Sequence, residues 1–223
     1  MLIPLLSFVP ALPAEDPARI VFETHQLSEE FFGEGASFGD FDGDGVSDVA
    51  AGPFWYRGPE FTEKERIYDG GAFDPAGYSD YFFSWARDID GDGATDLFVV
   101  GFPGKEAFWY RNPGEGVGDW SRHLVHDNVD NESPWFVDID ADGLEDLVCH
   151  SKGRLCWLER DSSDPAARWI RHDLSEDLGL QKFTHGLGVG DVDGDGRLDV
   201  LLNQGWWRPV SYTHLTLPTN REV

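Results

Sequence analysis

An acidic ten-residue pattern occurs four times in this chain, and it constrains the fold more than any other feature. The copies read "GDFDGDGVSD", "RDIDGDGATD", "VDIDADGLED" and "GDVDGDGRLD". Counted from its first aspartate, each copy has aspartate at positions 1, 3, 5 and 9 and glycine at position 6. The first aspartates lie 48, 50 and 53 residues apart: Asp40, Asp88, Asp138 and Asp191. A steady period of about 50 residues indicates a repeat architecture.

Each acidic loop is followed by the same order of segments that are typical of short strands. An apolar strand comes first ("DVAAG", "DLFVVG", "DLVCH", "DVLLN"), and a tryptophan strand follows it ("FWYRG", "AFWYRNPG", "LCWLERD", "GWWRP"). An outer strand closes three units, at 65–70, 121–127 and 168–174, and another strand precedes every loop ("ASFG", "FFSWAR", "PWFV", "HGLGVG"). Four strands in about 50 residues match one β-propeller blade. The predicted fold class is all-β, a propeller of four-stranded blades with about four blades present.

Two arrangements of these blades are compatible with the sequence. The blades form either an arc of a larger propeller or a closed four-bladed ring, in which "VFETHQL" at 21–27 adds the last strand to the final blade. In both arrangements a blade cannot bury its two faces alone, so neighbouring blades stack. We expect one tryptophan of each unit to fill the space between sheets. These residues are Trp55, Trp109, Trp157 and Trp206.

The aspartate spacing in the loops predicts a metal site. Carboxylates on alternate residues converge where a glycine allows a sharp turn, and six to eight oxygen ligands suit Ca²⁺. The backbone carbonyl of position 7 can add a ligand; this position holds Val46, Ala94, Leu144 or Arg197. Mg²⁺ prefers a smaller octahedral shell, and zinc or copper would require His or Cys, which the loops lack.

Two other interpretations of the loops are an EF-hand and metal-free turns. An EF-hand requires Glu at position 12, where this chain has Ala51, Val99, Cys149 or Leu202, so an EF-hand is excluded. Solvated Asp/Gly turns without a metal are common singly, but four loops with the same offsets argue against that interpretation. The third copy has Ala141 where the others have glycine at position 4.

The residues "FGDFDGDGVSDVAAGP" at 38–53 carry the Phe-Gly and Gly-Pro elements of FG-GAP repeats, also called VCBS-type repeats. The chain resembles this family over about residues 20–210. The resemblance implies the β-propeller of integrin α-subunit heads, with up to four Ca²⁺ held in loops 40–48, 88–96, 138–146 and 191–199. By this resemblance the metal ligands are Asp40, Asp42, Asp44 and Asp48; Asp88, Asp90, Asp92 and Asp96; Asp138, Asp140, Asp142 and Asp146; and Asp191, Asp193, Asp195 and Asp199.

Charge and family resemblance together limit the partners and functions that we expect for the chain. Acidic residues outnumber basic ones 42 to 17, and this excess repels nucleic acid and anionic membrane surfaces. No apolar run is long enough for a membrane span. The resemblance implies a bacterial secreted, periplasmic or cell-surface protein that serves in binding or adhesion, with an extracellular protein or a glycan as ligand.

The alternative function is a propeller-type carbohydrate-active enzyme, a lyase or dehydratase whose catalytic part is incomplete here. The stretch that begins "THGLGVGDVDGDG" resembles such enzymes, and His185 is the candidate base or metal ligand, with His150 second. A histidine at a strand start is more often structural, so no catalytic or cofactor-binding residue is assigned. The binding module therefore remains the preferred interpretation.

The two ends of the chain lie outside the repeat region, which spans 15–210. Residues 1–14 are predicted to be a signal peptide, because an apolar run ends in small residues before an acidic start. Residues 211–223, "SYTHLTLPTNREV", fit no strand of the repeat and resemble a translated sequencing adapter. We therefore expect the natural protein to be longer, with more blades.

The two cysteines flank a predicted hairpin centred on Lys152 and Gly153. The pairing sets Cys149 opposite Cys156, where a cross-strand disulfide is geometrically possible. Two buried free thiols are the other possibility. The sequence does not choose between them, and it offers no second Cys or His pair at zinc-site spacing.

Overall fold

The computed structural model describes residues 22–210 and 214–215, and this part of the chain contains strands and no helix. The predicted signal peptide at 1–14 lies outside the described residues, as does most of the tail at 211–223. Within the described residues, no helix that could span a membrane is present. The all-β class is confirmed.

Four antiparallel sheets follow one another along the chain. The first sheet contains β1 (Ala36–Gly39), β2 (Asp48–Ala51), β3 (Phe54–Tyr56) and β4 (Lys64–Arg66). The second contains β5 (Phe83–Arg87), β6 (Asp96–Val100), β7 (Lys105–Arg111) and β8 (Ser121–Val129). The third contains β9 (Trp135–Val137), β10 (Asp146–Ser151), β11 (Arg154–Glu159) and β12 (Ile170–Asp173). The fourth contains only β13 (Gly188–Gly190), β14 (Asp199–Leu202) and β15 (Gly205–Trp207). The strands predicted before and after each acidic loop are confirmed.

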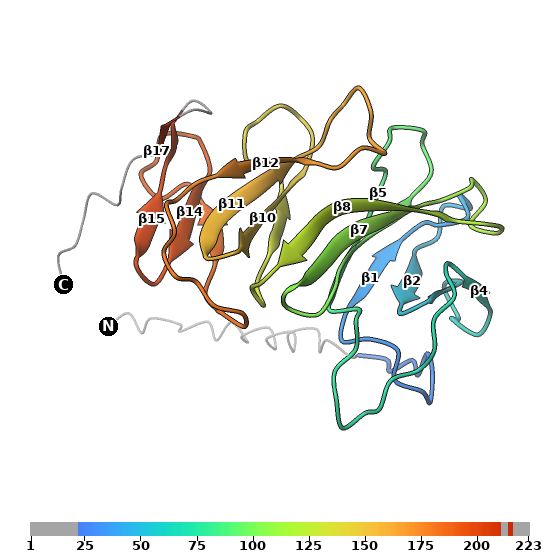
Figure 1. Ribbon diagram of the computed structural model, residues 1–223. Coiled ribbons are helices and arrows are strands. Elements are labelled where there is room, and N and C mark those ends of the chain that lie inside the picture. The colour runs from blue at the N-terminus through green and yellow to red at the C-terminus, as the bar shows by residue number, and fades with distance from the viewer. Residues whose placement is uncertain (1–21, 211–213, 216–223) are drawn as a thin grey trace, which may run out of the picture.

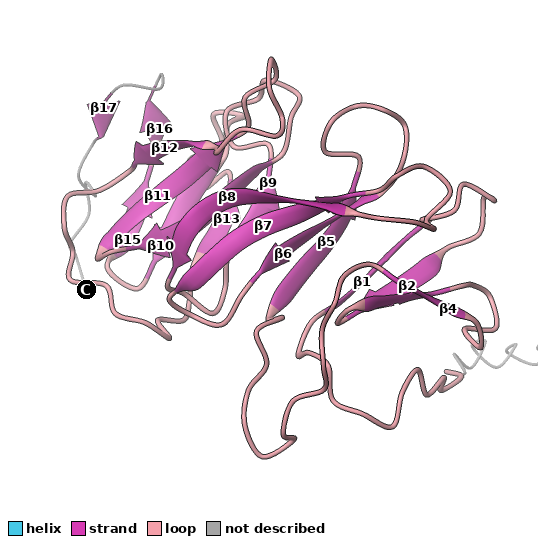
Figure 2. Cartoon of the chain, turned by 45° about the vertical axis from the view of Figure 1, so that its right-hand side comes forward, coloured by secondary structure: helices cyan, strands magenta, loops and turns pink. Residues whose placement is uncertain are grey.

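The four sheets lie side by side in an open row, with β1–β4 at one end and β13–β15 at the other (Figure 1). The arc arrangement therefore describes this structure, and the sheets are not closed into a ring. The predicted latch is wrong, because residues 22–27 form no strand and β15 is the last strand of the fourth sheet. Instead, β16 (Pro209–Val210) and β17 (His214–Leu215) pair with each other in a separate ladder (Figure 2).

Neighbouring sheets pack through three apolar cores, one in each gap between them. In each gap one sheet presents its tryptophan face, and the next sheet presents the opposite face of its second strand. Trp55 thus packs with Leu97 and Val99 of β6, and Trp109 packs with Leu147 of β10. The second strands β6 and β10 are buried on both faces. This explains why their sequences are mostly apolar instead of alternating between apolar and polar residues.

The prediction for Trp206 is wrong, although the prediction for the other three tryptophans is confirmed. The side chains of Trp55, Trp109 and Trp157 are at most 4% exposed, and each belongs to one of the three cores. Trp206 has the equivalent place in its ladder, but it lies on the outer face of the last described sheet and is only half-buried. Its neighbour Trp207 points the other way and joins the third core.

The cysteine hairpin forms with the predicted register. Cys149 lies opposite Cys156, and Lys152 and Gly153 make the turn with φ of 52° and 83°. The two Sγ atoms are 3.7 Å apart and buried, and both thiols are free. The structure therefore has the free-thiol arrangement.

Candidate metal centres

Each acidic loop connects the first and second strands of a sheet, and its backbone turns through left-handed residues. In the first loop, Gly43 and Gly45 have φ of 75° and 88°. The same two positions are left-handed in every copy, and in the third loop Ala141 takes φ of 62°. A left-handed alanine costs roughly 1–2 kcal/mol. The third loop thus keeps the shape of the others in spite of its alanine.

The aspartate at position 1 organises the backbone of its own loop. Asp40 accepts hydrogen bonds from the backbone N–H groups of Gly43 at 2.8 Å, Asp44 at 3.1 Å and Gly45 at 2.8 Å. The second and fourth loops repeat this set. In the third loop, Asp138 accepts the bonds from positions 5 and 6. Such side-chain to backbone bonds make the loop shape a local property of the sequence.

The aspartate at position 9 is buried in every copy, at 0% or 1% exposure. One oxygen of this aspartate accepts the N–H of position 2, as Asp48 does from Phe41 at 2.8 Å. Burial raises the pKa of Asp96 to about 7 and that of Asp146 to about 8. A bound cation would offset the desolvation of such a carboxylate.

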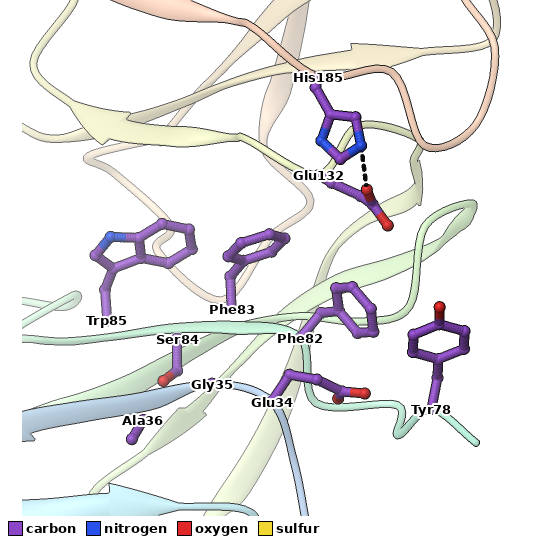
Figure 3. Close-up of a pocket in the computed structure, with 10 residues that line it drawn as sticks. All are labelled: Glu34, Gly35, Ala36, Tyr78, Phe82, Phe83, Ser84, Trp85, Glu132 and His185. Carbon is purple, nitrogen blue, oxygen red and sulfur yellow. Dashed lines mark ion pairs between the residues drawn. The ribbon is translucent and has the colours of Figure 1, made fainter. Parts of the chain in front are cut away.

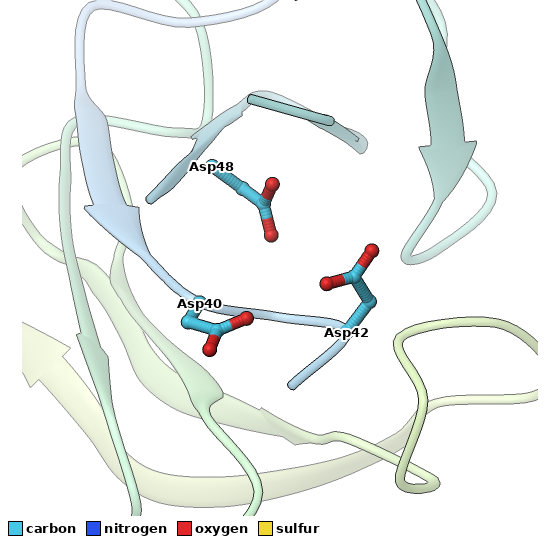
Figure 4. A group of neighbouring side chains, drawn as sticks. All are labelled: Asp40, Asp42 and Asp48. Atoms are coloured by element: carbon cyan, nitrogen blue, oxygen red, sulfur yellow. The ribbon is translucent and has the colours of Figure 1, made fainter. Parts of the chain in front are cut away.

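The aspartates at positions 1, 3 and 9 converge in all four loops. In each loop, one oxygen from each of these three side chains lies within 4.8 Å of the other two. Figure 4 shows the first group, in which Asp40, Asp42 and Asp48 come from opposite sides of the loop. The three-residue groups with this composition are Asp40, Asp42 and Asp48; Asp88, Asp90 and Asp96; Asp138, Asp140 and Asp146; and Asp191, Asp193 and Asp199. Their all-oxygen donor set fits a hard cation such as Ca²⁺.

Among the described residues, the position 5 aspartates lie outside the groups formed by positions 1, 3 and 9, although Asp142 belongs to a second acidic group in the third loop. The position 5 side chain accepts the N–H of position 7, as in the bond of 2.8 Å from Val46 to Asp44. Asp92, Asp142 and Asp195 make the same bond in their loops. The carbonyls of Val46, Ala94, Leu144 and Arg197 stay predicted ligands.

Three loops have an arginine beside their aspartates, and the third loop has a glutamate there. Arg57 and Arg208 follow the tryptophan strands of their sheets and Arg111 ends its own, and each pairs with the aspartate at position 3. For example, Arg111 Nε lies 2.5 Å from Asp90 Oδ2. The strand register places Glu159 at the corresponding point of the third sheet, and Glu159, Asp140 and Asp142 also form a group within 4.8 Å.

These charged neighbours were missed in the sequence, although they leave a signal there. Aligning the tryptophan strands as "WYR", "WYR", "WLE" and "WWR" shows arginine at one offset in three units and Glu159 in the fourth. At this offset the third candidate site therefore has a carboxylate, which also contacts His172 at 2.6 Å, where the other three sites have a guanidinium group.

The two candidate histidines lie in different environments. His185 precedes β13, its side chain is 75% exposed, and its Nε2 atom lies 2.9 Å from Glu132 Oε2. His150 is fully buried on β10, and neither ring nitrogen has a hydrogen-bond partner among the described residues. Burial lowers the pKa of His150 from 6.5 to about 4.

This burial predicts a specific acid sensitivity. Below pH 6.5 the unfolded chain protonates His150 and the folded chain does not, so the free energy of unfolding falls as pH drops towards 4. The loss reaches about 3 kcal/mol at 1.36 kcal/mol per pKa unit. We expect His150→Leu to remove this part of the pH dependence in urea unfolding at saturating calcium. Equal losses in both proteins between about pH 7 and pH 4.5 would contradict the prediction.

Comparison with known proteins gives one result. A family model described as an FG-GAP-like repeat matches residues 88–149 and 138–202, which together make up about half of the chain. Each match begins at the first aspartate of an acidic loop and extends past the next loop. A search of curated proteins finds no match.

Proposed function

The chain belongs to the FG-GAP-like repeat family, and on that premise we propose that it is a calcium-stabilised β-propeller module of a secreted or cell-surface protein. Its role is binding or adhesion, with an extracellular protein or glycan as ligand. The observation that carries the calcium part is the convergence of three carboxylates in all four loops. Calcium would neutralise these groups, and the loops would thereby hold the first and second strands of each sheet together.

The extracellular setting follows from the same chemistry. Calcium modules of this kind bind with Kd values of about 10⁻⁴–10⁻³ M, a range that suits extracellular calcium concentrations and leaves sites empty in a resting cytosol. FG-GAP repeats are typical of extracellular proteins. Both considerations support secretion.

We do not propose the enzymatic alternative. It depends on His185, and among the described residues the structure gives Glu132 as the ion-pair partner of that side chain. A lyase or dehydratase needs a base, an acid and an electrophilic group around one substrate atom. The binding role needs no such set.

Calorimetric titration of the whole chain with CaCl₂ tests the proposal. We expect saturable uptake of up to four Ca²⁺ with Kd values of about 10⁻³ M or tighter. Mg²⁺ should bind more weakly, because it demands a near-ideal octahedral shell and gives up its water ligands reluctantly. A titration without heat up to about 10 mM CaCl₂, repeated at two temperatures, would refute the calcium role.

The third loop is expected to fill first. Glu159 adds a negative charge where the other sites have a positively charged arginine. The electrostatic attraction between Ca²⁺ and the site should therefore be stronger in the third loop. We expect Glu159→Arg to weaken the tightest calcium-binding step by about tenfold or more. Competition against a chromophoric chelator measures this step.

The reverse substitution is the matched control. Arg57→Glu gives the first loop the charge pattern of the third, so it should produce a second tight step and leave the original one unchanged. Identical stepwise constants in the wild type and in Glu159→Arg would show that this charge difference has no effect on binding.

A further inference from the structure

A pocket of about 630 Å³ lies beside the starts of the first strands of the sheets, at the strand ends that face away from the acidic loops. Its lining comes from residues before or within the starts of β1 and β5, and from the segments that precede β9 and β13. The acidic loops follow the other ends of these strands, so the pocket and the candidate metal centres are separated by the strand length. Figure 3 shows Glu132 and His185 on one side of the pocket and Glu34 on the other, with aromatic rings between them.

The aromatic side of the pocket continues into an exposed cluster. Tyr78 packs against Phe82 and Phe102, with ring centroids 5.9 Å and 5.5 Å away, and Phe102 also contacts Phe183. Tyr78 is 68% exposed and Phe183 is 46% exposed. These rings come from three separate loops and contact one another, while Tyr78 and Phe183 remain exposed. An exposed aromatic patch beside a pocket is typical of a binding surface.

The backbone at Phe183 adds an independent indication. Phe183 has φ of 64°, a left-handed conformation that is unfavourable for an aromatic residue. Its N–H donates to the carbonyl of Asp130 at 3.0 Å, and this bond helps to hold the conformation. Strained residues of this kind concentrate at functional sites. Here the strain positions a half-exposed ring at the edge of the cluster.

The polar groups of the pocket are already oriented by neighbours. Glu132 pairs with His185 at 2.9 Å, and Glu34 accepts the N–H of Ser79 at 3.1 Å. A carboxylate has about four acceptor sites, so both side chains keep lone pairs for further donors. The pocket thus combines apolar rings with fixed acceptors and one imidazole.

We propose that this pocket binds a ring of a neutral oligosaccharide. A sugar ring has one face of C–H groups, which would pack on Tyr78 and Phe82, and hydroxyl groups that would donate to Glu132 and Glu34. The inference rests on the proposed function, since it names the ligand class of the binding module. Uronic acids and other anionic sugars are excluded, because both carboxylates and the overall charge of −25 would repel them.

A neutral sugar is favoured over a cationic ligand. Glu132 already contacts His185 and Glu34 already accepts the Ser79 N–H, so both carboxylates are held in place as hydrogen-bond acceptors. A sugar ring matches this combination, since it presents an apolar C–H face to the aromatic rings and several hydroxyl donors to the spare acceptor positions.

Binding experiments use the full chain in about 5 mM CaCl₂. A panel of neutral glycans is followed by calorimetric titration with cellohexaose, mannohexaose, xylohexaose and galactohexaose, with hexagalacturonate as the anionic probe and hexalysine as the cationic one. We expect saturable binding of at least one neutral probe and none of the charged probes. Tyr78→Ala and Glu132→Gln should each weaken that binding by about tenfold or more.

The controls separate the pocket from general effects. Tyr78 is largely exposed and Glu132→Gln keeps the side-chain shape, so both variants should melt like the wild type. Ile170→Ala removes another exposed apolar side chain, on β12 outside the pocket, and should bind as the wild type does. The inference is overturned if no neutral glycan binds, if hexalysine binds in place of the sugars, or if Tyr78→Ala binds unchanged.

Failure of this inference differs from failure of the proposed calcium role. Calcium uptake without sugar binding contradicts only the pocket assignment. Sugar binding that persists in EGTA, on a chain that takes up no calcium, supports the pocket and contradicts calcium stabilisation.

Discussion

Removing calcium with EGTA is expected to unfold most of the repeat region. At about 10 mM calcium and Kd values of about 10⁻⁴–10⁻³ M, each site stabilises the folded chain by about 1.4–2.7 kcal/mol. Four sites then contribute about 6–11 kcal/mol, which is comparable to the whole stability of a typical domain. Thermal melting followed by tryptophan fluorescence, with calcium and with EGTA, measures the difference.

Two features of the metal-free loops support so large an effect. The position 9 carboxyl groups are buried, and burial raises the pKa of Asp96 and Asp146, which shows that their ionised form is unfavourable without a cation. In each loop this group also lies close to the aspartates at positions 1 and 3, so the carboxylates repel one another in the metal-free chain. A melting temperature that is the same with calcium and with EGTA would contradict the prediction. Adding MgCl₂ in place of calcium controls for general ionic effects.

Trp109→Ala is expected to destabilise the fold strongly. The side chain is 1% exposed, and it packs between the second and third sheets and stacks on His123 with ring centroids 4.6 Å apart. Replacing a buried tryptophan by alanine costs about 3–5 kcal/mol, because it leaves a cavity that the sheets cannot close. Urea unfolding at saturating calcium measures the loss.

The matched control is Trp206→Ala. Trp206 has the same ladder position as Trp109, but no described sheet covers it, so its removal should cost about 1 kcal/mol or less. Equal losses in the two variants would mean that the outer face of the last sheet is covered in solution. This outcome would contradict the half-buried position of Trp206 on the outer face of the last described sheet.

Much of the architecture was predictable because it depends on local spacing. The acidic loops take their shape from hydrogen bonds within about five residues, as those from Asp40 to Gly43 and Gly45 show. Strand order follows from alternating and apolar runs between these loops. The convergence of the aspartates at positions 1, 3 and 9 follows from the same short-range geometry, and so do the Cys149 and Cys156 register and the turn between them.

Other features depend on residues that are distant in sequence. Trp206 was expected in a core, yet the tertiary structure leaves it on an outer face while Trp207 is buried. The state of the cysteine pair also required the structure, since opposite ladder positions are compatible with either a disulfide or free thiols. The pocket around Glu132 and His185 draws on segments of all four sheets, which no single repeat contains.

The sequence by itself therefore determined the repeat unit, its strands and the acidic loops, since hydrogen bonds and side-chain alternation act over a few residues. The tertiary structure alone decided that the row of sheets is open, which tryptophans are covered, which charges face each loop and where a pocket forms. These properties arise from the stacking of whole sheets, and burial of a face depends on the presence of a neighbour rather than on the face itself.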